Sequence, residues 1–155
     1  MLMINDMDKE EIEKLKSCVK NSESTRRVHI PYENTTGRKP DFEVQYNLNI
    51  SPDLVGVNPA QGMRCDFLYD GDDPKIDCIY QIWPELLDEK GDVILDKSIP
   101  ITPMGMATMW IGSQEMREKI HQKRIKVGVN GYWVIGSQRL AKVTVTKIIG
   151  LFENG

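Results

Sequence analysis

Between Phe42 and Ile50, apolar and polar residues alternate along the chain. The apolar residues hold the even positions, and they are Phe42, Val44, Tyr46, Leu48 and Ile50. The polar residues hold the odd positions, and they are Glu43, Gln45, Asn47 and Asn49. Successive side chains of a strand point to opposite faces, so this alternation predicts a half-buried β-strand. We expect the even set to face the core and the odd set to face solvent.

Similar short apolar segments recur along the rest of the chain, separated by residues that favour turns. The segments predicted to be strands are Met63–Tyr69, Cys78–Trp83, Met106–Ile111, Gly131–Gly136 and Leu140–Leu151. Asp70–Pro74 has strong turn chemistry, and Glu89–Asp92 is predicted to be a hairpin turn from which Val93–Leu95 returns. Many short strands with frequent turns predict an all-β barrel or sandwich.

Two segments favour helix instead. Asp6–Lys20 places Met7, Ile12, Leu15 and Val19 roughly on one face, which predicts an amphipathic N-terminal helix. Ser113–Gln122 is rich in helix-forming Gln and Glu and begins with a capping serine, so we expect a short helical crossover there. The polar, turn-rich residues 21–40 are predicted to be a linker, with an extended piece at Arg27–Tyr32.

Composition and charge narrow the class of protein. A chain of 155 residues with 40% hydrophobic and 28% charged residues is typical of a single globular domain. Its net charge of −3 disfavours nucleic acid as a partner of the whole chain. We expect no membrane span, because no apolar run is long enough, and no signal peptide, because charges fill the first residues. Three cysteines at unrelated spacings indicate a reducing cytoplasm.

Few residues have the spacing of a catalytic or metal-binding site. Neither His29 nor His121 has a second ligand at helical or zinc spacing, so we expect both on the surface or at its rim. Cys65 and Cys78 lie in apolar strands and are predicted to be buried and unreactive. The Asp70–Asp73 run favours a solvated acidic turn over a calcium loop, because Pro74 breaks the spacing.

The remaining motifs also favour a protein without catalytic chemistry. No phosphate-binding glycine loop occurs, which disfavours nucleotide binding. Trp83, Trp110 and Trp133 each lie among apolar neighbours, so we predict packing rather than a base-stacking platform. We therefore expect no cofactor, no metal and no enzyme activity. An unrecognised enzyme assembled from distant strands remains the alternative.

Four segments together resemble the C-terminal β-barrel domain of elongation factor Tu. Pro40–Val44 resembles the strand that opens this barrel, and Met63–Phe67 resembles a segment in which Arg64 and Phe67 match. Thr102–Met109 resembles a turn and its following strand, and Gln122–Gly150 resembles the closing hairpin. The resemblance implies a closed six-stranded antiparallel barrel over residues 39–152, preceded by a helix and linker over residues 1–38. It implies a barrel that stands alone, without the GTPase domain of the family.

These observations favour a non-catalytic binding module in the cytoplasm, whose partner is most simply a protein. One version is an immunity protein that neutralises a basic toxin, since acidic loops around Asp70–Asp73 and Glu85–Asp92 would suit such a partner. The alternative is an accessory protein of translation that binds RNA or tRNA through a local basic patch. The candidate binding residues are Lys119, Lys123, Arg124, Lys126, Arg139 and Lys142 for the basic set, and Asp70, Asp72 and Asp73 for the acidic set.

Overall fold

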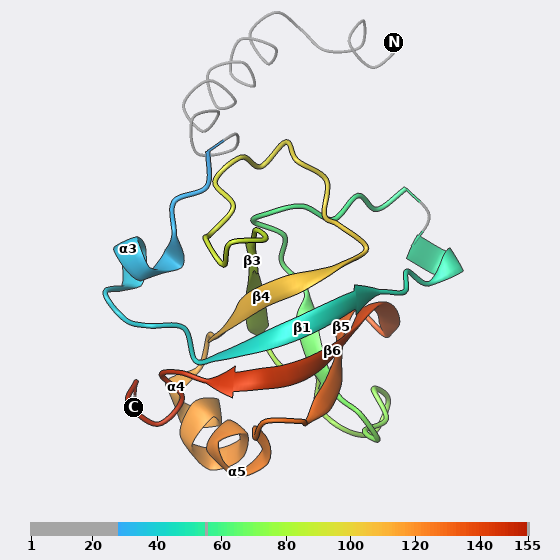
Figure 1. Cartoon of the computed structure of the whole chain (residues 1–155). Helices are drawn as coiled ribbons and strands as arrows, with labels where there is room; N and C mark the ends of the chain where they lie inside the picture. Colours follow the sequence, from blue (N-terminus) through green and yellow to red (C-terminus); the bar gives the residue numbers. More distant parts are fainter. Residues whose placement is uncertain (1–27, 55, 155) are drawn as a thin grey trace, which may run out of the picture.

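One antiparallel sheet of six strands forms the body of the molecule (Figure 1). The computed structural model describes residues 28–54 and 56–154. The strands are β1 (Phe42–Leu48), β2 (Asp66–Tyr69), β3 (Ile82–Leu87), β4 (Met104–Ile111), β5 (Asn130–Ile135) and β6 (Gln138–Ile148). Their order across the sheet is β2-β5-β6-β1-β4-β3, so the first strand lies in the middle and the long β6 beside it. The predicted mostly β architecture is confirmed.

The sheet curls into a half-barrel and does not close, so the closed barrel that we expected is wrong. Irregular pairing at Glu43/Val44 and at Trp133/Val134 strengthens the curl, as bulges do. The edge strands β2 and β3 nevertheless form no ladder with each other, and apart from its pairing with β5, β2 makes only an isolated bridge between Phe67 and Tyr80, a residue that precedes β3. The backbone N–H groups of these two residues donate to each other's carbonyls at 2.8 and 2.9 Å. The sheet therefore stays open between β2 and β3.

The alternation along β1 sets the buried face of the sheet as predicted. Phe42, Val44 and Tyr46 are buried, while Gln45 and Asn47 are exposed. They pack in one core with the inward residues of the other strands, among them Phe67, Ile82, Met109, Trp133, Leu140, Val143 and Val145. The prediction was wrong at two positions, since Glu43 is half-buried and Ile50 does not face the core. Ile50 is 39% exposed because β1 stops at Leu48, which is itself half-buried.

Aromatic side chains fill the core so tightly that they require small neighbours. The rings of Tyr46 and Trp133 lie 5.1 Å apart, and Trp133 is fully buried, as predicted for a packing tryptophan. A Cβ atom at Gly105 would lie 2.6 Å from the Tyr46 hydroxyl oxygen. A Cβ atom at Gly131 would collide with the Phe67 ring. Two strand glycines therefore make room for two core aromatics.

Strand β3 lies later in the sequence than predicted, and it contains Pro84. The strand was predicted over Cys78–Trp83, but it starts at Ile82 and continues through Pro84 to Leu87. At Pro84, β3 pairs only with β4, so the outer edge there needs no N–H donor from proline. Cys78 consequently lies outside the strand and is exposed, contrary to prediction, whereas Cys65 is buried as expected.

Helical structure covers the lower end of the sheet in Figure 1, where the sequence predicted a helical crossover. It comprises α4 (Gln114–Met116), the π-helical turn η2 (Arg117–His121) and α5 (Gln122–Arg124). The Ser113 hydroxyl accepts the Met116 N–H at 3.2 Å, which confirms the predicted cap. Two further short helices are α3 (Tyr32–Thr36), which interrupts the expected linker, and η1 (Pro52–Leu54). The predicted helix over Asp6–Lys20 lies outside the described residues.

A buried carboxylate joins this helical crossover to the sheet. Asp41 Oδ1 accepts a hydrogen bond from Arg117 Nε at 2.8 Å, and Asp41 Oδ2 accepts one from the Ile111 N–H at 2.8 Å. Arg38 and Asn154 each donate a further side-chain hydrogen bond to the same carboxylate at 3.1 Å. One side chain thus connects the chain entering β1, the end of β4, η2 and the C-terminal turn.

Candidate binding groove

The hairpin that follows β3 forms one wall of a surface groove. Its tight turn is built on Asp88, whose carboxylate accepts the N–H groups of Lys90 at 2.9 Å and Asp92 at 3.0 Å. Gly91 has a φ of 85°, a left-handed conformation that glycine adopts without strain. Val93 pairs with Leu87, and the Ile94 N–H donates to the Leu86 carbonyl at 3.0 Å. The predicted turn and its return are therefore confirmed.

A buried glutamine, which the sequence analysis missed, holds this return segment in place. The Gln61 amide nitrogen donates to the carbonyls of Leu86 at 3.0 Å and Ile94 at 2.8 Å. Its amide oxygen accepts the Leu86 N–H at 2.8 Å. Gln61 therefore bonds β3 and the return segment at once, and it satisfies the Leu86 N–H and the Ile94 carbonyl. A single glutamine between turn residues carries no sequence signal for this role.

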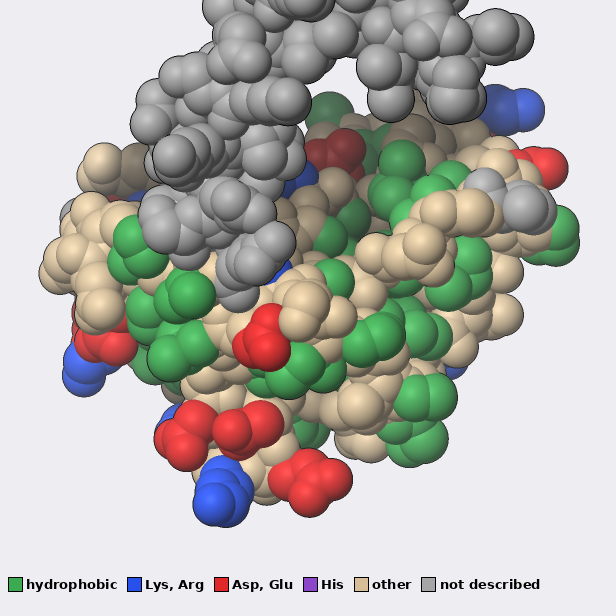
Figure 2. All heavy atoms as spheres, turned by 90° about the horizontal axis from the view of Figure 1, so that it is seen from above, with side chains coloured by type: hydrophobic (Ala, Val, Ile, Leu, Met, Phe, Trp, Pro, Cys, Tyr) green, Lys and Arg blue, Asp and Glu red, His purple; other side chains and the backbone are tan. Residues whose placement is uncertain are grey.

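The groove between this hairpin and the start of β4 has a volume of about 880 Å³. Its apolar lining consists of Leu87, Val93, Ile94, Leu95, Ile99, Met104 and Met106. Four carboxylates and one lysine line it as well: Asp88, Glu89, Asp92, Asp96 and Lys90. We call this set the acidic groove. Figure 2 looks onto this end of the molecule and shows hydrophobic side chains gathered there with acidic side chains among them.

Three apolar side chains of the acidic groove are open to solvent. Leu95 and Ile99 are each 49% exposed, and Met104 is 58% exposed. Isolated exposed apolar residues are ordinary, but a contiguous apolar surface with a polar rim is typical of an interaction site. The arrangement can therefore bury an apolar segment and place positive charges of that segment beside carboxylates.

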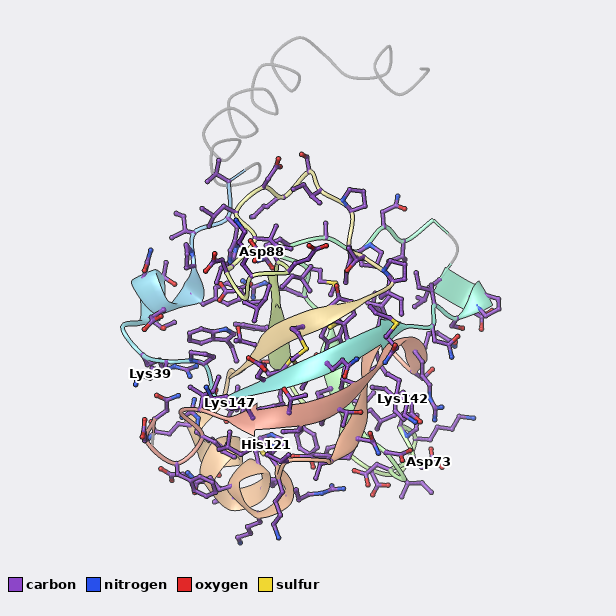
Figure 3. The ribbon with its side chains drawn as sticks, in the orientation of Figure 1. Lys39, Asp73, Asp88, His121, Lys142 and Lys147 are labelled. Carbon is purple, nitrogen blue, oxygen red and sulfur yellow. The ribbon has the colours of Figure 1, made fainter. Side chains whose placement is uncertain are left out.

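The predicted acidic loops do not form one rim. Figure 3 places Asp88 near one end of the molecule and Asp73 near the other. Glu85, which we had assigned to the acidic surface, is only 2% exposed. The groove therefore draws its charge from the loops 88–92 and 96, whereas Asp70, Asp72 and Asp73 belong to a separate surface.

The predicted basic residues share that second surface with the acidic loop. The two terminal guanidinium nitrogens of Arg124 donate to the Asp72 carboxylate, at 2.9 and 3.1 Å, and the guanidinium carbon lies 3.8 Å from the Tyr69 ring centroid. The Tyr132 hydroxyl donates to Asp70 at 3.1 Å, and Arg139 covers the Tyr132 ring. The basic and acidic candidates are thus interleaved, and they neutralise each other in part.

The other basic candidates are exposed, and they differ in their ion pairs. Lys119 pairs with Glu115 at 2.6 Å on the helical crossover. Within residues 28–54 and 56–154, Lys123, Lys126 and Lys142 form no salt bridge. Asp73 is engaged in its own loop, where its carboxylate accepts the Lys75 N–H at 2.8 Å. Among the described residues, these three lysines are therefore exposed cations without a carboxylate partner.

Both histidines are buried, contrary to the prediction of surface positions. His29 Nε2 lies 2.5 Å from Glu85 Oε2, and the same oxygen accepts the Tyr32 N–H at 2.8 Å. His121 Nδ1 lies 2.7 Å from the Tyr69 hydroxyl. Burial lowers the pKa of His121 to about 4, against the opposing effect of Asp41 and with help from Arg124 and Arg117.

The buried cysteine Cys65 is not activated as a nucleophile. Burial, with the charge of Asp66 adding to it, raises the pKa of the Cys65 thiol to about 12. A protonated thiol at neutral pH is a poor nucleophile. Among the described residues, no group of three or more His, Cys, Asp or Glu side chains has the geometry to hold a metal ion.

Comparisons with known proteins add no further identification. No model of a known protein family matches the chain, and no curated protein matches it. Within residues 28–54 and 56–154, no helix is long and apolar enough to cross a membrane. The geometry therefore defines the class of protein as a mostly β protein with an open, curled sheet and an acidic surface groove.

Proposed function

We propose that this protein is a non-catalytic module that binds a partner protein through the acidic groove. The partner contributes a segment with apolar side chains and flanking Lys or Arg residues. The observation that carries the proposal is the exposure of Leu95, Ile99 and Met104 in one groove whose charged side chains are mainly carboxylates. Apolar contact supplies affinity at the centre of such an interface, and charge complementarity supplies specificity at its rim.

A basic toxin is one partner with this chemistry, which keeps the role of an immunity protein within the proposal. The likeness to the barrel of elongation factor Tu remains a prediction from sequence. An RNA partner is less well supported, because Arg124 is paired with Asp72 and Lys119 with Glu115. Binding to RNA is therefore an alternative outcome of the test.

The test uses methyl NMR with two synthetic peptides of equal length, one of alternating Leu and Lys and one of alternating Leu and Glu. We expect the lysine peptide to shift the methyl signals of Leu95, Ile99 and Met104, and the glutamate peptide to leave them unchanged. Leu95→Glu and Ile99→Glu should each weaken binding of the lysine peptide at least about tenfold, since they place charge in the apolar contact.

Ile76→Glu is the matched control, because Ile76 is an exposed apolar residue (82%) outside the groove. It should bind the lysine peptide like the wild type. Equal binding of both peptides, no binding, or equal loss in the control would contradict the proposal. A filter-binding titration with bulk tRNA at two salt concentrations provides the other arm. Tight and salt-sensitive tRNA binding that is lost on charge reversal at Lys123 and Lys126 would favour the RNA alternative.

A further inference from the structure

A second pocket, smaller than the acidic groove and of opposite charge, lies beside α3. It has a volume of about 200 Å³, and the lining residues used below are His29, Tyr32, Thr35, Gly62, Arg64 and Lys97. We call it the cationic pocket. The loop that contributes Lys97 to it contributes Asp96 to the acidic groove. The two sites therefore share one loop, and neighbouring residues of that loop contribute opposite charges to them.

Two cations of the pocket are positioned by neighbours that are not carboxylates. The Arg64 guanidinium carbon lies 4.3 Å from the Trp83 ring centroid. Stacking on an aromatic face orients a guanidinium and leaves its N–H edge free to bind a planar or tetrahedral oxyanion. In the described part of the chain, neither Arg64 nor Lys97 forms a salt bridge.

Gly62 makes room for the lysine. A Cβ atom at this position would lie 3.1 Å from Lys97 Cε and 3.3 Å from Lys97 Nζ. The φ of Gly62 is 88°, so the backbone also favours glycine here. The ammonium group of Lys97 consequently lies against bare backbone at the pocket wall, and its side chain is half-buried. The Lys97 side chain is therefore packed against the pocket wall, unlike a fully exposed surface lysine.

Neutral donors complete the lining. Burial raises the pKa of the Tyr32 hydroxyl, the charge of Glu85 adds to this rise, and the charge of Arg64 opposes it. Tyr32 therefore stays protonated at neutral pH and can donate a hydrogen bond. The carboxylate of Glu85 is occupied by the Tyr32 N–H and by His29. Glu85 itself is not among the residues that line the pocket.

We propose that the cationic pocket binds a phosphate group, held by Arg64 and Lys97 and oriented by the Tyr32 hydroxyl. Charge-assisted hydrogen bonds from a guanidinium and an ammonium group are the strongest contacts that a protein side chain offers to phosphate. The small volume admits the phosphate itself and only a few attached atoms. This site is independent of the proposed protein partner, since it uses other residues and the opposite charge.

The test is a calorimetric titration of the full chain with inorganic phosphate and with phosphoethanolamine at physiological chloride. We expect saturable binding of at least one probe. Tighter binding of phosphoethanolamine would identify a phosphomonoester as the source of the group, and tighter binding of inorganic phosphate would identify the free ion. Arg64→Gln and Lys97→Gln should each weaken binding about tenfold or more, and the double variant should abolish it.

Lys147→Gln is the matched control, because Lys147 is an exposed cation on β6 (Figure 3) and is not among the residues that line the pocket. It should bind phosphate like the wild type. Far-UV circular dichroism shows whether the variants keep their fold, which we expect because Arg64 is exposed and Lys97 is half-buried. Binding that survives in the folded double variant would overturn the proposal. Absence of binding by the wild type at 10 mM probe, roughly the weakest affinity of interest, would do the same.

Discussion

Asp41 and Glu85 are both buried carboxylates, but their surroundings differ. Asp41 is fully buried, and both of its oxygens accept two hydrogen bonds each. Two of the donors are the guanidinium groups of Arg38 and Arg117. These four hydrogen bonds offset the cost of removing the charge from water, and they leave no free lone pair on the carboxylate to bind a ligand. Asp41 is therefore a structural residue that joins distant segments.

Glu85 uses one oxygen for two contacts, one with the Tyr32 N–H and one with His29. Both of these partners line the cationic pocket. The carboxylate thus fixes the wall of a surface site instead of joining the ends of the chain. Burial alone therefore does not distinguish a structural carboxylate from one that supports a site. The two are distinguished by the number of hydrogen-bond donors around the carboxylate and by whether those donors line a surface pocket.

The largest effect should come from removing the charge of Asp41. Asp41→Asn leaves the guanidinium of Arg117 buried without a carboxylate, so we expect the free energy of unfolding to fall by about 3–5 kcal/mol. Urea denaturation followed by tryptophan fluorescence measures the change. Arg38→Gln is the control, because the Arg38 side chain is 26% exposed and its pair should contribute about 1 kcal/mol or less. Equal losses in the two variants would contradict the structural role.

The second largest effect on stability should come from the protonation of His121 at acidic pH. The pKa of His121 is lowered to about 4 in the folded protein from an ordinary value of 6.5. Between these values the unfolded chain binds the proton and the folded chain does not, so stability falls as the pH drops through 6.5 towards 4. We expect this group to contribute a loss of about 2 kcal/mol between pH 7 and pH 4.5.

The measurement compares urea denaturation of the wild type and His121→Gln at both pH values. The variant cannot titrate at this position, so its loss on acidification should be smaller than that of the wild type by this amount. His29 is present in both proteins, and its contribution cancels in the difference. Identical losses in the two proteins would show that His121 takes up its proton equally easily in the folded state.

The smallest effect should come from Glu85→Gln. This change keeps the volume and an acceptor for the Tyr32 N–H, and it removes the need to bury a charge. We expect a loss of about 1 kcal/mol in urea denaturation, the ordinary net value of a hydrogen bond. A loss as large as that of Asp41→Asn would mean that the two carboxylates have the same structural role, and the comparison would fail.

The sequence predicted the local features of the fold well. Alternation identified the inward face of β1, and the Ser113 cap marked the helical crossover. The turn at Glu89–Asp92 was predicted from turn chemistry, and with it part of the acidic rim of the groove. Each of these features depends on residues a few positions apart, where side-chain direction and backbone preference act directly.

Tertiary structure decided the features that depend on distant residues. His29 and Glu85 lie 56 positions apart, and Asp41 and Arg117 lie 76 apart, so no spacing in the sequence could announce either contact. The strand order that leaves β2 and β3 as the two edges of the sheet also depends on residues far apart in the chain. Curl, burial of the histidines and both surface sites arise only when the sheet brings these segments together, because long-range pairing is set by the whole fold and not by local preference.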